Sequence, residues 1–344
     1  METCCVNTTT ERQEERFAAN NPVSDVERMM IATLLSMAGT LGITGNTLVI
    51  SAVLLFKKLR SSTNVFVVNL CIADWITCVN MPWTVLAIVN PENEWPLPDW
   101  ICVWCGFNLI SCIGCSTFTL SLIAFNRLVI ITSHAKLYPV IFTKTKMFFM
   151  VLFAWIFPLS LATIPLVSDF GDLGYDYKYR TCTWDTANPN SDTYSLLLAT
   201  AFTPIQFLII IICYFKIFLF IRGHTKRLHP GSSDTSTSHA PSNDLPTSDT
   251  PNDAPGASSL RNALTKRQVK VTKNMFYVVC GFVICLMPFG LSLMISVENV
   301  ERLVFYSAVF LVSSCFINPI IYCTKHPDFK GAIIKILKCK CRNV

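Results

Sequence analysis

The sequence predicts an all-α membrane protein: a bundle of seven transmembrane helices followed by an amphipathic helix on the membrane surface. Three observations predict this fold class. Of the 344 residues, 52% are hydrophobic and only 15% are charged, whereas soluble domains carry about 25% charged residues. Seven segments are apolar over the roughly 20 residues needed to cross a bilayer. Basic residues gather in alternate connecting segments, a pattern typical of proteins that cross a membrane several times.

Two of the expected spans are apolar on every face, whereas a soluble helix of that length would keep a polar stripe. Prolines interrupt several spans, and membrane helices tolerate such kinks because neighbouring groups satisfy the freed carbonyls. The expected spans are 30–56, 64–89, 101–131, 146–167, 194–221, 270–297 and 302–323.

The chain divides into an N-terminal tail (1–29), the seven-span domain (30–325) and a terminal part (326–344) with the amphipathic helix and a short tail. Within the domain, the connecting segment 222–267 is rich in Ser, Thr, Pro and Asp and has no aromatic residue. Such a composition predicts disorder. Its hydroxyls are candidate phosphorylation sites that would recruit a desensitising partner through added charge; the alternative is a spacer.

The loop charges predict the orientation. The tail and the segments after the second, fourth and sixth spans hold six Lys/Arg by count, and the others lie on the opposite side. The rule that basic loops stay inside therefore predicts an extracellular N-terminus, a cytoplasmic C-terminus and a plasma-membrane protein. The first 28 residues lack an apolar signal segment, so the first span is expected to act as its own insertion signal. Asn7, in Asn-Thr-Thr, is then a candidate for glycosylation.

The net charge of +6 is the sum of a basic inner face and an acidic outer face. Basic inner loops meet anionic lipid headgroups, so membrane lipid is an expected partner and nucleic acid is not. The sequence also shows no metal-binding His/Cys spacing, no Gly-rich phosphate loop and no nucleophile–base pair. We therefore do not expect an enzyme. A transporter is the rival from another class, but the sequence lacks the internal repeats that transporters show.

Arg127 lies inside the run SLIAFNRLVIIT, where an unpaired guanidinium is costly. It follows Cys102 by 25 residues, or about 38 Å of helix, which exceeds the roughly 30 Å of hydrocarbon. Cys102 is therefore expected at the outer mouth, and Arg127 at the inner mouth, where its guanidinium can reach water or a partner. Cys182 is the single cysteine of the loop between the fourth and fifth spans. The oxidising exterior predicts a Cys102–Cys182 disulfide.

Most other cysteines lie within spans and are expected to be small packing residues. The segment HPDFKGAIIKILKCKC has Phe329, Ile333, Ile336 and Leu337 on one face and lysines on the other, which predicts a helix lying on the membrane. Cys339 and Cys341 at its end are palmitoylation candidates; the alternative is idle reduced thiols.

Seven motifs in order resemble those of the rhodopsin-like (class A) G-protein-coupled receptors over residues 30–340. They are Asn46 in GNTLVI, Asp74 in NLCIADW, Trp95 seven residues before Cys102, Asn126-Arg127-Leu128, Trp155, FVICLMP, and NPIIY followed by DFK. The resemblance implies a receptor that transmits binding of an extracellular ligand to a heterotrimeric G protein, with receptor kinases and arrestin as further partners.

The resemblance also assigns residues that rearrange around the G protein; the alternative is a fixed hydrogen-bonded network. These switch residues are Asn126, Arg127, Tyr214, Phe282, Pro288, Asn318, Pro319 and Tyr322. It further implies an allosteric sodium ion, with no required cofactor, held by Asp74, Ser116, Ser314 and Asn318. These side chains offer the oxygen atoms that a hard cation needs. The alternative is that Asp74 is protonated, or that it holds only water together with Asn46 and Asn318.

The expected ligand is neutral, lipid-like or a peptide, since amine receptors carry an aspartate where this sequence has Leu109. The expected lining is apolar and has few polar anchors; the alternative is that it is packing core and that the outer loops hold the ligand. The lining residues are Leu109, Ile113, Trp184, Phe289, Leu293, Ala308 and Val312.

The sequence departs from the family pattern at several switch positions. Asn126 stands where the family has an acid, Leu286 where it has a tryptophan, and Gln268 where many members have an acid facing the arginine. Leu128 also stands where the family has a tyrosine. With Asn126, Leu128 and Leu286 at these positions, a receptor-like protein that no longer couples is an alternative. Pro204 precedes Tyr214 by ten residues rather than eight, which predicts a bulge or shifted kink in the fifth span. The Asn-Arg pair with GYDYKYRTCTWD is similar to melatonin receptors and related invertebrate orphan receptors, although the melatonin group has Asn-Ala in the seventh span.

Overall fold

The computed structural model describes residues 23–132, 137–228, 276–291 and 300–338. In these ranges six helical segments are long and apolar enough to cross a membrane, and Phe276–Leu291 is a shorter apolar helix within the expected sixth span. The elements are α2 (Asp25–Leu55), η1 (Lys57–Leu59), α3 (Ser62–Val89), α4 (Asp99–Thr132), α5 (Tyr138–Ile141), α6 (Lys144–Val167), β1 (Leu173–Asp176), β2 (Thr181–Trp184), α7 (Ser191–Phe202), α8 (Pro204–Leu228), α10 (Val300–Lys325) and α11 (Pro327–Leu337).

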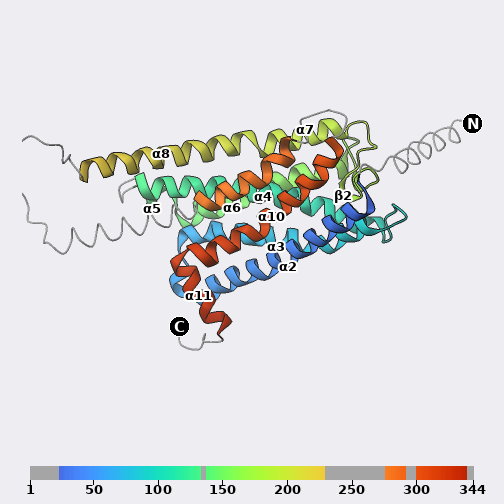
Figure 1. The fold of residues 1–344 in the computed structure, drawn as a ribbon. Helices are drawn as coiled ribbons and strands as arrows, with labels where there is room; N and C mark the ends of the chain where they lie inside the picture. Colours follow the sequence, from blue (N-terminus) through green and yellow to red (C-terminus); the bar gives the residue numbers. More distant parts are fainter. Residues whose placement is uncertain (1–22, 133–136, 229–275, 292–299, 339–344) are drawn as a thin grey trace, which may run out of the picture.

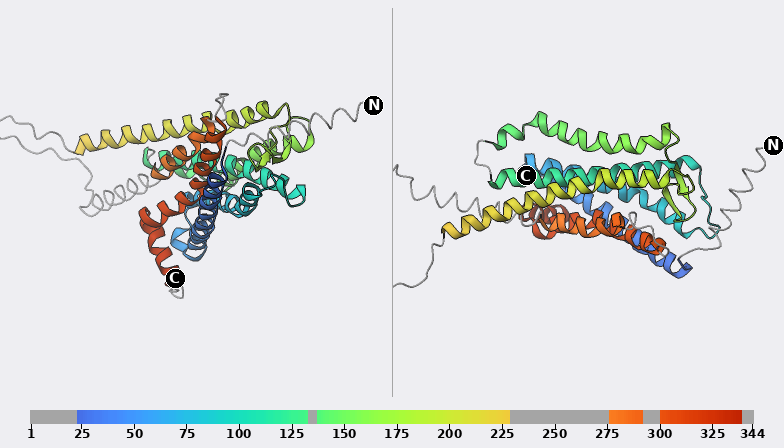
Figure 2. Two further views of the ribbon diagram at one scale, coloured as in Figure 1. Left: turned by 45° about the vertical axis from the view of Figure 1, so that its right-hand side comes forward. Right: turned by 90° about the horizontal axis from the view of Figure 1, so that it is seen from above.

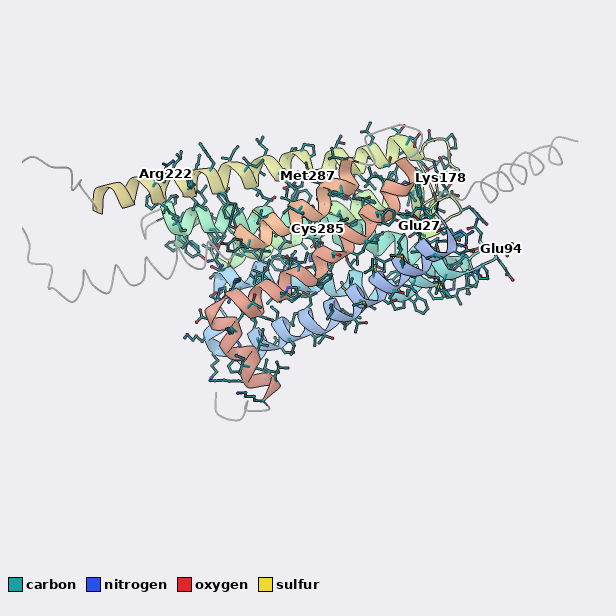
Figure 3. The ribbon with its side chains drawn as sticks, viewed as in Figure 1. Glu27, Glu94, Lys178, Arg222, Cys285 and Met287 are labelled. Carbon is teal, nitrogen blue, oxygen red and sulfur yellow. A yellow bond between two sulfur atoms is a disulfide. The ribbon has the colours of Figure 1, made fainter. Side chains whose placement is uncertain are left out.

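The long helices run side by side along one direction and form an elongated bundle (Figures 1 and 2). α4 lies at its centre and packs against α3, α6 and α8, while α2 packs against α3 and α10. We call the end of the bundle that contains Cys102 the disulfide end and the opposite end, near Arg127, the arginine end. Glu27, Glu94 and Lys178 lie at the disulfide end, and Arg222 lies at the arginine end (Figure 3).

The first span begins earlier than expected because its N-terminus is capped. Ser24 and Glu27 form a capping box: the backbone N–H of Glu27 donates to Ser24 Oγ at 3.3 Å, and that of Ser24 donates to Glu27 Oε2 at 2.9 Å. Such a box satisfies two of the amide groups that a helix start leaves open. The helix therefore starts at Asp25 rather than at residue 30.

The fifth span is broken into two helices, as the unusual position of Pro204 predicts. α7 ends at Phe202 and α8 begins at Pro204. Proline has no N–H to donate, so the regular hydrogen-bond ladder stops there. Two backbone hydrogen bonds still connect the two helices: Thr203 N–H donates to the Ala199 carbonyl at 3.2 Å, and Phe207 N–H donates to the Thr203 carbonyl at 3.0 Å. The two halves of this span therefore meet at a shifted kink.

α11 follows α10 and turns away from the bundle axis (Figure 1). Its Phe329 and Ile333 are buried in the largest apolar cluster of the bundle, while Lys330 and Lys335 are exposed. The expected amphipathic helix is confirmed, with one exception: Leu337 is 65% exposed instead of packing with the other apolar residues, because it lies on the last turn.

Candidate functional site

Three helices bring one guanidinium and two phenols together at the arginine end. Arg127 of α4 lies near Tyr214 of α8 and Tyr322 of α10, and both phenols interact with it electrostatically. Arg127 is only 3% exposed. Of the two expected alternatives for its guanidinium, water or a partner, the structure favours a partner, because Tyr214 and Tyr322 lie beside the buried group. No acid of the described residues forms an ion pair with Arg127, and its Nε has no hydrogen-bond partner among them.

Asn126 contacts the short helix α5 rather than the neighbouring arginine. Its Nδ2 donates to the hydroxyl of Tyr138 at 3.4 Å, and its Oδ1 has no partner in the described part of the chain. Asn126 is 0% exposed. A buried amide oxygen without a donor is unfavourable. The position that the resemblance assigns to an acid is therefore occupied by a neutral side chain that does not bind Arg127.

Aromatic contacts close the arginine end. The ring of Tyr214 packs edge-on against Phe276 with centroids 5.1 Å apart, and Tyr322 packs against Phe329 of α11 with centroids 5.7 Å apart. The hydroxyls of both tyrosines are buried and have no hydrogen-bond partner among the described residues. Dispersion and burial therefore hold these rings in place, so they can move apart without breaking a hydrogen bond.

A second polar cluster surrounds Asp74 in the middle of α3. Ser116 Oγ donates to Asp74 Oδ1 at 3.1 Å, and Asn318 Nδ2 donates to Asp74 Oδ2 at 2.8 Å. Cys315 lines the cavity beside this carboxyl group. Ser314 instead donates to the Leu311 carbonyl at 2.6 Å, but it lines the same small cavity. The four residues expected around a sodium ion therefore lie together.

The Asp74 cluster has the donor set for one small hard cation. Oδ1 of Asn318 and Oδ1 of Asn46 are buried and accept no hydrogen bond from the described residues, so oxygen atoms are available besides the carboxylate. The cavity measures about 10 Å³, roughly the space of a single water molecule. No group of three or more His, Cys, Asp or Glu side chains with metal-binding geometry occurs within the described ranges. Oxygen donors with a single acid favour an alkali cation over a transition metal.

A larger cavity of about 50 Å³ lies between α4, α7 and the helix Phe276–Leu291, under β2. Ile113, Trp184 and Phe289 line it, as expected for the ligand site. Leu109 and Val312 instead line the cavity around Asp74, which Ile113 also touches. Ala308 lines neither cavity, because its half-buried side chain lies elsewhere on α10. Leu293 lies outside the described residues.

The lining that the sequence did not identify comes mainly from α7. Leu198, Ala199 and Phe202 border the 50 Å³ cavity, together with Thr203 at the break in the fifth span. Because Pro204 does not lie at the family's distance from Tyr214, the sequence did not show which residues of this span face the cavity. Apart from Thr203 and the indole of Trp184, the lining is apolar.

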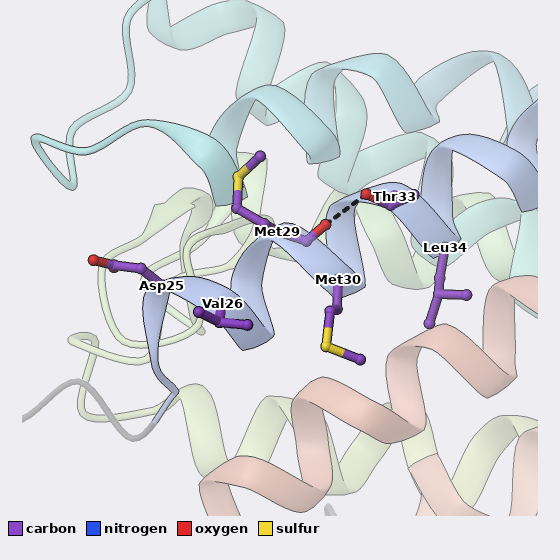
Figure 4. Close-up of a pocket in the computed structure, with 6 residues that line it drawn as sticks. All are labelled: Asp25, Val26, Met29, Met30, Thr33 and Leu34. Carbon is purple, nitrogen blue, oxygen red and sulfur yellow. Dashed lines mark hydrogen bonds between the residues drawn. The ribbon is translucent and has the colours of Figure 1, made fainter.

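A third hollow runs along the outer face of α2 at the disulfide end (Figure 4). Val26, Met29, Met30 and Leu34 line it, and Thr33 turns its hydroxyl back to the Met29 carbonyl at 2.7 Å. These exposed apolar side chains are what a spanning helix presents to lipid acyl chains. We therefore do not treat this hollow as part of the functional site.

The family comparison agrees with this arrangement. Residues 45–322 match the family model described as "7 transmembrane receptor (rhodopsin family)". The chain belongs to this receptor family. Members are non-enzymatic receptors, so the expectation that this chain is not an enzyme is confirmed by its family.

Two relatives illustrate how far the similarity of the receptor extends. It is 28% identical to the G-protein coupled receptor moody of Drosophila melanogaster over 337 residues, which cover 87% of this chain and 50% of moody. It is 26% identical to a GQ-coupled rhodopsin of Mizuhopecten yessoensis, over 93% of this chain and 62% of that protein. The receptor thus spans about half to two thirds of the length of these relatives.

The fold of the receptor matches that of squid rhodopsin with a TM-score of 0.74 at 19% identity, over 93% of this chain and 88% of the other. At this identity the match shows the fold alone. It supports the seven-helix architecture, including the sixth span, of which the structure describes 276–291.

The remaining switch residues of the receptor are Phe282 and Pro288 on the helix Phe276–Leu291 and Pro319 on α10. Phe282 is buried and lines the cavity around Asp74, while Pro288 is half-buried six residues further along the same helix. Pro319 follows Asn318 in α10 and packs against α2, where a Cβ added at Gly45 would lie 2.8 Å from the proline ring. The absence of a side chain at Gly45 therefore permits this close helix contact.

The disulfide end of the receptor is covered by the β1–β2 hairpin. Its strands are antiparallel, with Tyr175 opposite Cys182, and the expected Cys102–Cys182 disulfide is present and fixes the hairpin to α4. Asp176 is fully buried and accepts hydrogen bonds from the backbone N–H groups of Tyr179 and Thr186, each at 2.7 Å. Burial raises the pKa of Asp176, although these hydrogen bonds oppose the shift.

Several predicted sites lie outside the described residues. These are Asn7, Gln268, Leu293, Cys339, Cys341 and nearly all of the connecting segment 222–267. Sequence reasoning missed Tyr138 and Phe276 at the arginine end. Neither residue belongs to one of the family motifs, so only the packing between helices reveals their contacts.

Proposed function

We propose that this receptor transmits binding of an extracellular ligand to a heterotrimeric G protein across the plasma membrane. The disulfide end faces the exterior and the arginine end faces the cytoplasm. The observation that carries the proposal is the meeting of Arg127, Tyr214 and Tyr322 from three different helices. Among the residues that the structure describes, no acid pairs with this arginine. In the described part of the chain, aromatic contacts close the arginine end and bury Arg127. Because these contacts involve no strong polar bonds, the helices can separate there.

The ligand is neutral, lipid-like or a peptide that reaches in from above the hairpin. The cavity under Trp184 offers no carboxylate to an amine, because its polar lining consists of Thr203 and the Trp184 indole. A space of about 50 Å³ holds only a few water-sized groups. A larger ligand must therefore either enlarge this cavity or place most of its bulk against the hairpin.

Sodium is proposed as an allosteric ligand of the Asp74 cluster. Asp74 and Ser116 offer oxygens to one small cavity, and Asn318 is bonded to the same carboxylate, so a cation bound there would add to the contacts that join α3, α4 and α10. A ligand shifts a conformational equilibrium only through different affinities for the two states. We propose that the closed state is the one that binds sodium more tightly. Receptor kinases, arrestin, glycosylation at Asn7 and palmitoylation at Cys339 and Cys341 remain proposals from the family resemblance.

The test is G-protein activation in transfected cells, read out for several G-protein classes, including the Gq class named for the Mizuhopecten relative. We expect activation above the level of untransfected cells, with or without members of a ligand library. Arg127→Ala should reduce activation while surface expression remains. Thr33→Ala, on the exposed outer face of α2 and away from both polar clusters, is the control and should leave activation unchanged.

The same assay separates the rival functions. A protein with normal surface expression that activates no G protein under any ligand would be a non-coupling receptor-like protein, and solute uptake without G-protein activation would indicate a transporter. Equal activation by wild type and Arg127→Ala would contradict the role given to the arginine end.

A further inference from the structure

One hydrogen bond joins α4 to α8 in the interior of the bundle. Ser121 Oγ donates to Oε1 of Gln206 at 2.8 Å, which is closer than its other acceptors, the carbonyls of Thr117 at 3.3 Å and Gln206 at 3.5 Å. Ser121 is 5% exposed and Gln206 is 5% exposed. Polar side chains within a membrane bundle are costly unless they bond to each other. The pair is therefore a specific link between two spans.

The position of this link connects the two regions of the site. Gln206 lies two residues after Pro204, directly below the break at Thr203, and Thr203 lines the 50 Å³ cavity. It also lies eight residues before Tyr214, where the family resemblance places a proline. Eight residues of helix span about 12 Å. α8 thus carries, in order, the cavity wall, the link to α4 and the tyrosine beside Arg127.

A swing of α8 about the break would move its two ends unequally. Gln206 lies about 3 Å of helix rise from Pro204, whereas Tyr214 lies about 15 Å from it. A small shift at Gln206 is therefore enlarged about fivefold at Tyr214. The Tyr214 hydroxyl has no hydrogen-bond partner among the described residues. Close to the break, the directional contact that restrains α8 is therefore the Ser121–Gln206 hydrogen bond.

We propose that Ser121 and Gln206 are positioning residues whose hydrogen bond holds α8 against α4 and keeps the arginine end closed. This inference rests on the proposed function, because it assigns the closed end to the uncoupled state. The cavity wall at Thr203 adjoins the link, so a ligand that displaces this wall loosens the bond and releases Tyr214 from Arg127.

The variants are Ser121→Ala, Gln206→Leu and the double variant. Ser111→Ala is the matched control, because Ser111 is a buried serine on the same helix. Among the described residues its hydroxyl bonds only to its own helix, at the Phe107 carbonyl. Single interhelical hydrogen bonds in membrane proteins correspond to about a threefold change in an equilibrium constant. We expect about threefold higher basal G-protein activation, per receptor at the surface, in all three variants and no change in the control.

Thermal stability separates positioning from simple damage. Ser121→Ala leaves the Gln206 oxygen buried without its donor, which costs more than removing both partners. The purified Ser121→Ala protein should therefore unfold about 2 °C lower, while the double variant regains most of this loss and keeps its raised basal activation. Unfolding can be followed with a thiol-reactive dye, since most of the free cysteines are buried.

A readout independent of coupling is alkylation of Cys213, which is buried next to Tyr214. Peptide mass spectrometry on the purified receptor should show about threefold faster alkylation of Cys213 in the double variant than in wild type or Ser111→Ala. If wild type activates no G protein, the proposed function fails, but faster alkylation would still support the link. An unchanged rate of Cys213 alkylation in the double variant overturns the inference. A basal activation that falls together with the unfolding temperature in the variants overturns it as well.

Discussion

The neutral residue beside Arg127 makes a strong prediction about the balance between the closed and open states. In the structure Asn126 bonds to Tyr138, and no acid pairs with Arg127 in the described part of the chain. Asn126→Asp would place a carboxylate one residue from the guanidinium. It would also keep the Tyr138 contact, because a carboxylate oxygen can accept a hydrogen bond from the tyrosine hydroxyl. The variant thus adds a charge pair and little else.

The size of the effect follows from opposing contributions. Two charges 4 Å apart attract by about 4 kcal/mol at an effective dielectric constant of about 20. Burying a carboxylate where Asn126 is 0% exposed removes much of this gain, and exposed pairs contribute about 0–1 kcal/mol. A net stabilisation of the closed state by about 1 kcal/mol remains. That shifts a two-state equilibrium about fivefold.

The assay is basal G-protein activation divided by surface expression. We expect appreciable basal activation in wild type and about fivefold less in Asn126→Asp. Asn108→Asp adds the same charge to α4 near its other end and should have no effect. Within the described part of the chain, Asn108 bonds only to the Trp104 carbonyl. If wild type is silent and Asn126→Asp raises activation, Arg127 is held closed by other means and the reasoning is wrong.

Three further predictions concern other parts of the receptor. Cys182→Ala should lower surface expression because the hairpin loses its link to α4, whereas Cys105→Ala, a buried free thiol, should not; flow cytometry of unpermeabilised cells measures this. Added sodium should lower basal activation, and Asp74→Asn should abolish that response; a sodium response that persists in the variant excludes the site. Since burial raises the pKa of Asp176, its contribution to stability is greatest at acidic pH and is lost as pH rises through its folded-state pKa. Asp176→Asn should flatten that part of the pH dependence of the melting temperature, and an unchanged profile would contradict the assignment.

The sequence was sufficient for those parts of the site that follow from position along a helix. The depth of Cys102 and Arg127 follows from counting residues at a fixed rise, and the single cysteine of the loop identified Cys182 as the partner. The Asp74 cluster was predictable because the family motifs fix the register of α3, α4 and α10. These predictions did not depend on how side chains pack.

Contacts that depend on packing between helices were not predictable. Counting residues places Arg127 at the end of the membrane, but it does not reveal that Tyr214 and Tyr322 bury the guanidinium. Similarly, the unusual position of Pro204 signals a kink without fixing which residues of α7 line the cavity. The partner of Gln206 could not be inferred either, because α4 carries Ser111, Ser116 and Ser121, and the sequence does not say which of them faces α8.

The Cys102–Cys182 bond has a topological consequence. It closes a covalent ring of chain that contains nearly all of α4, the whole of α5, α6 and β1, and the start of β2, with a sequence separation of 80 residues. A protease that cuts once inside this ring, for example between α5 and α6, leaves the receptor as a single covalent molecule. A cut outside it, for example in 229–275, produces two separate fragments. Electrophoresis with and without a reducing agent therefore tells on which side of the ring a cleavage site lies.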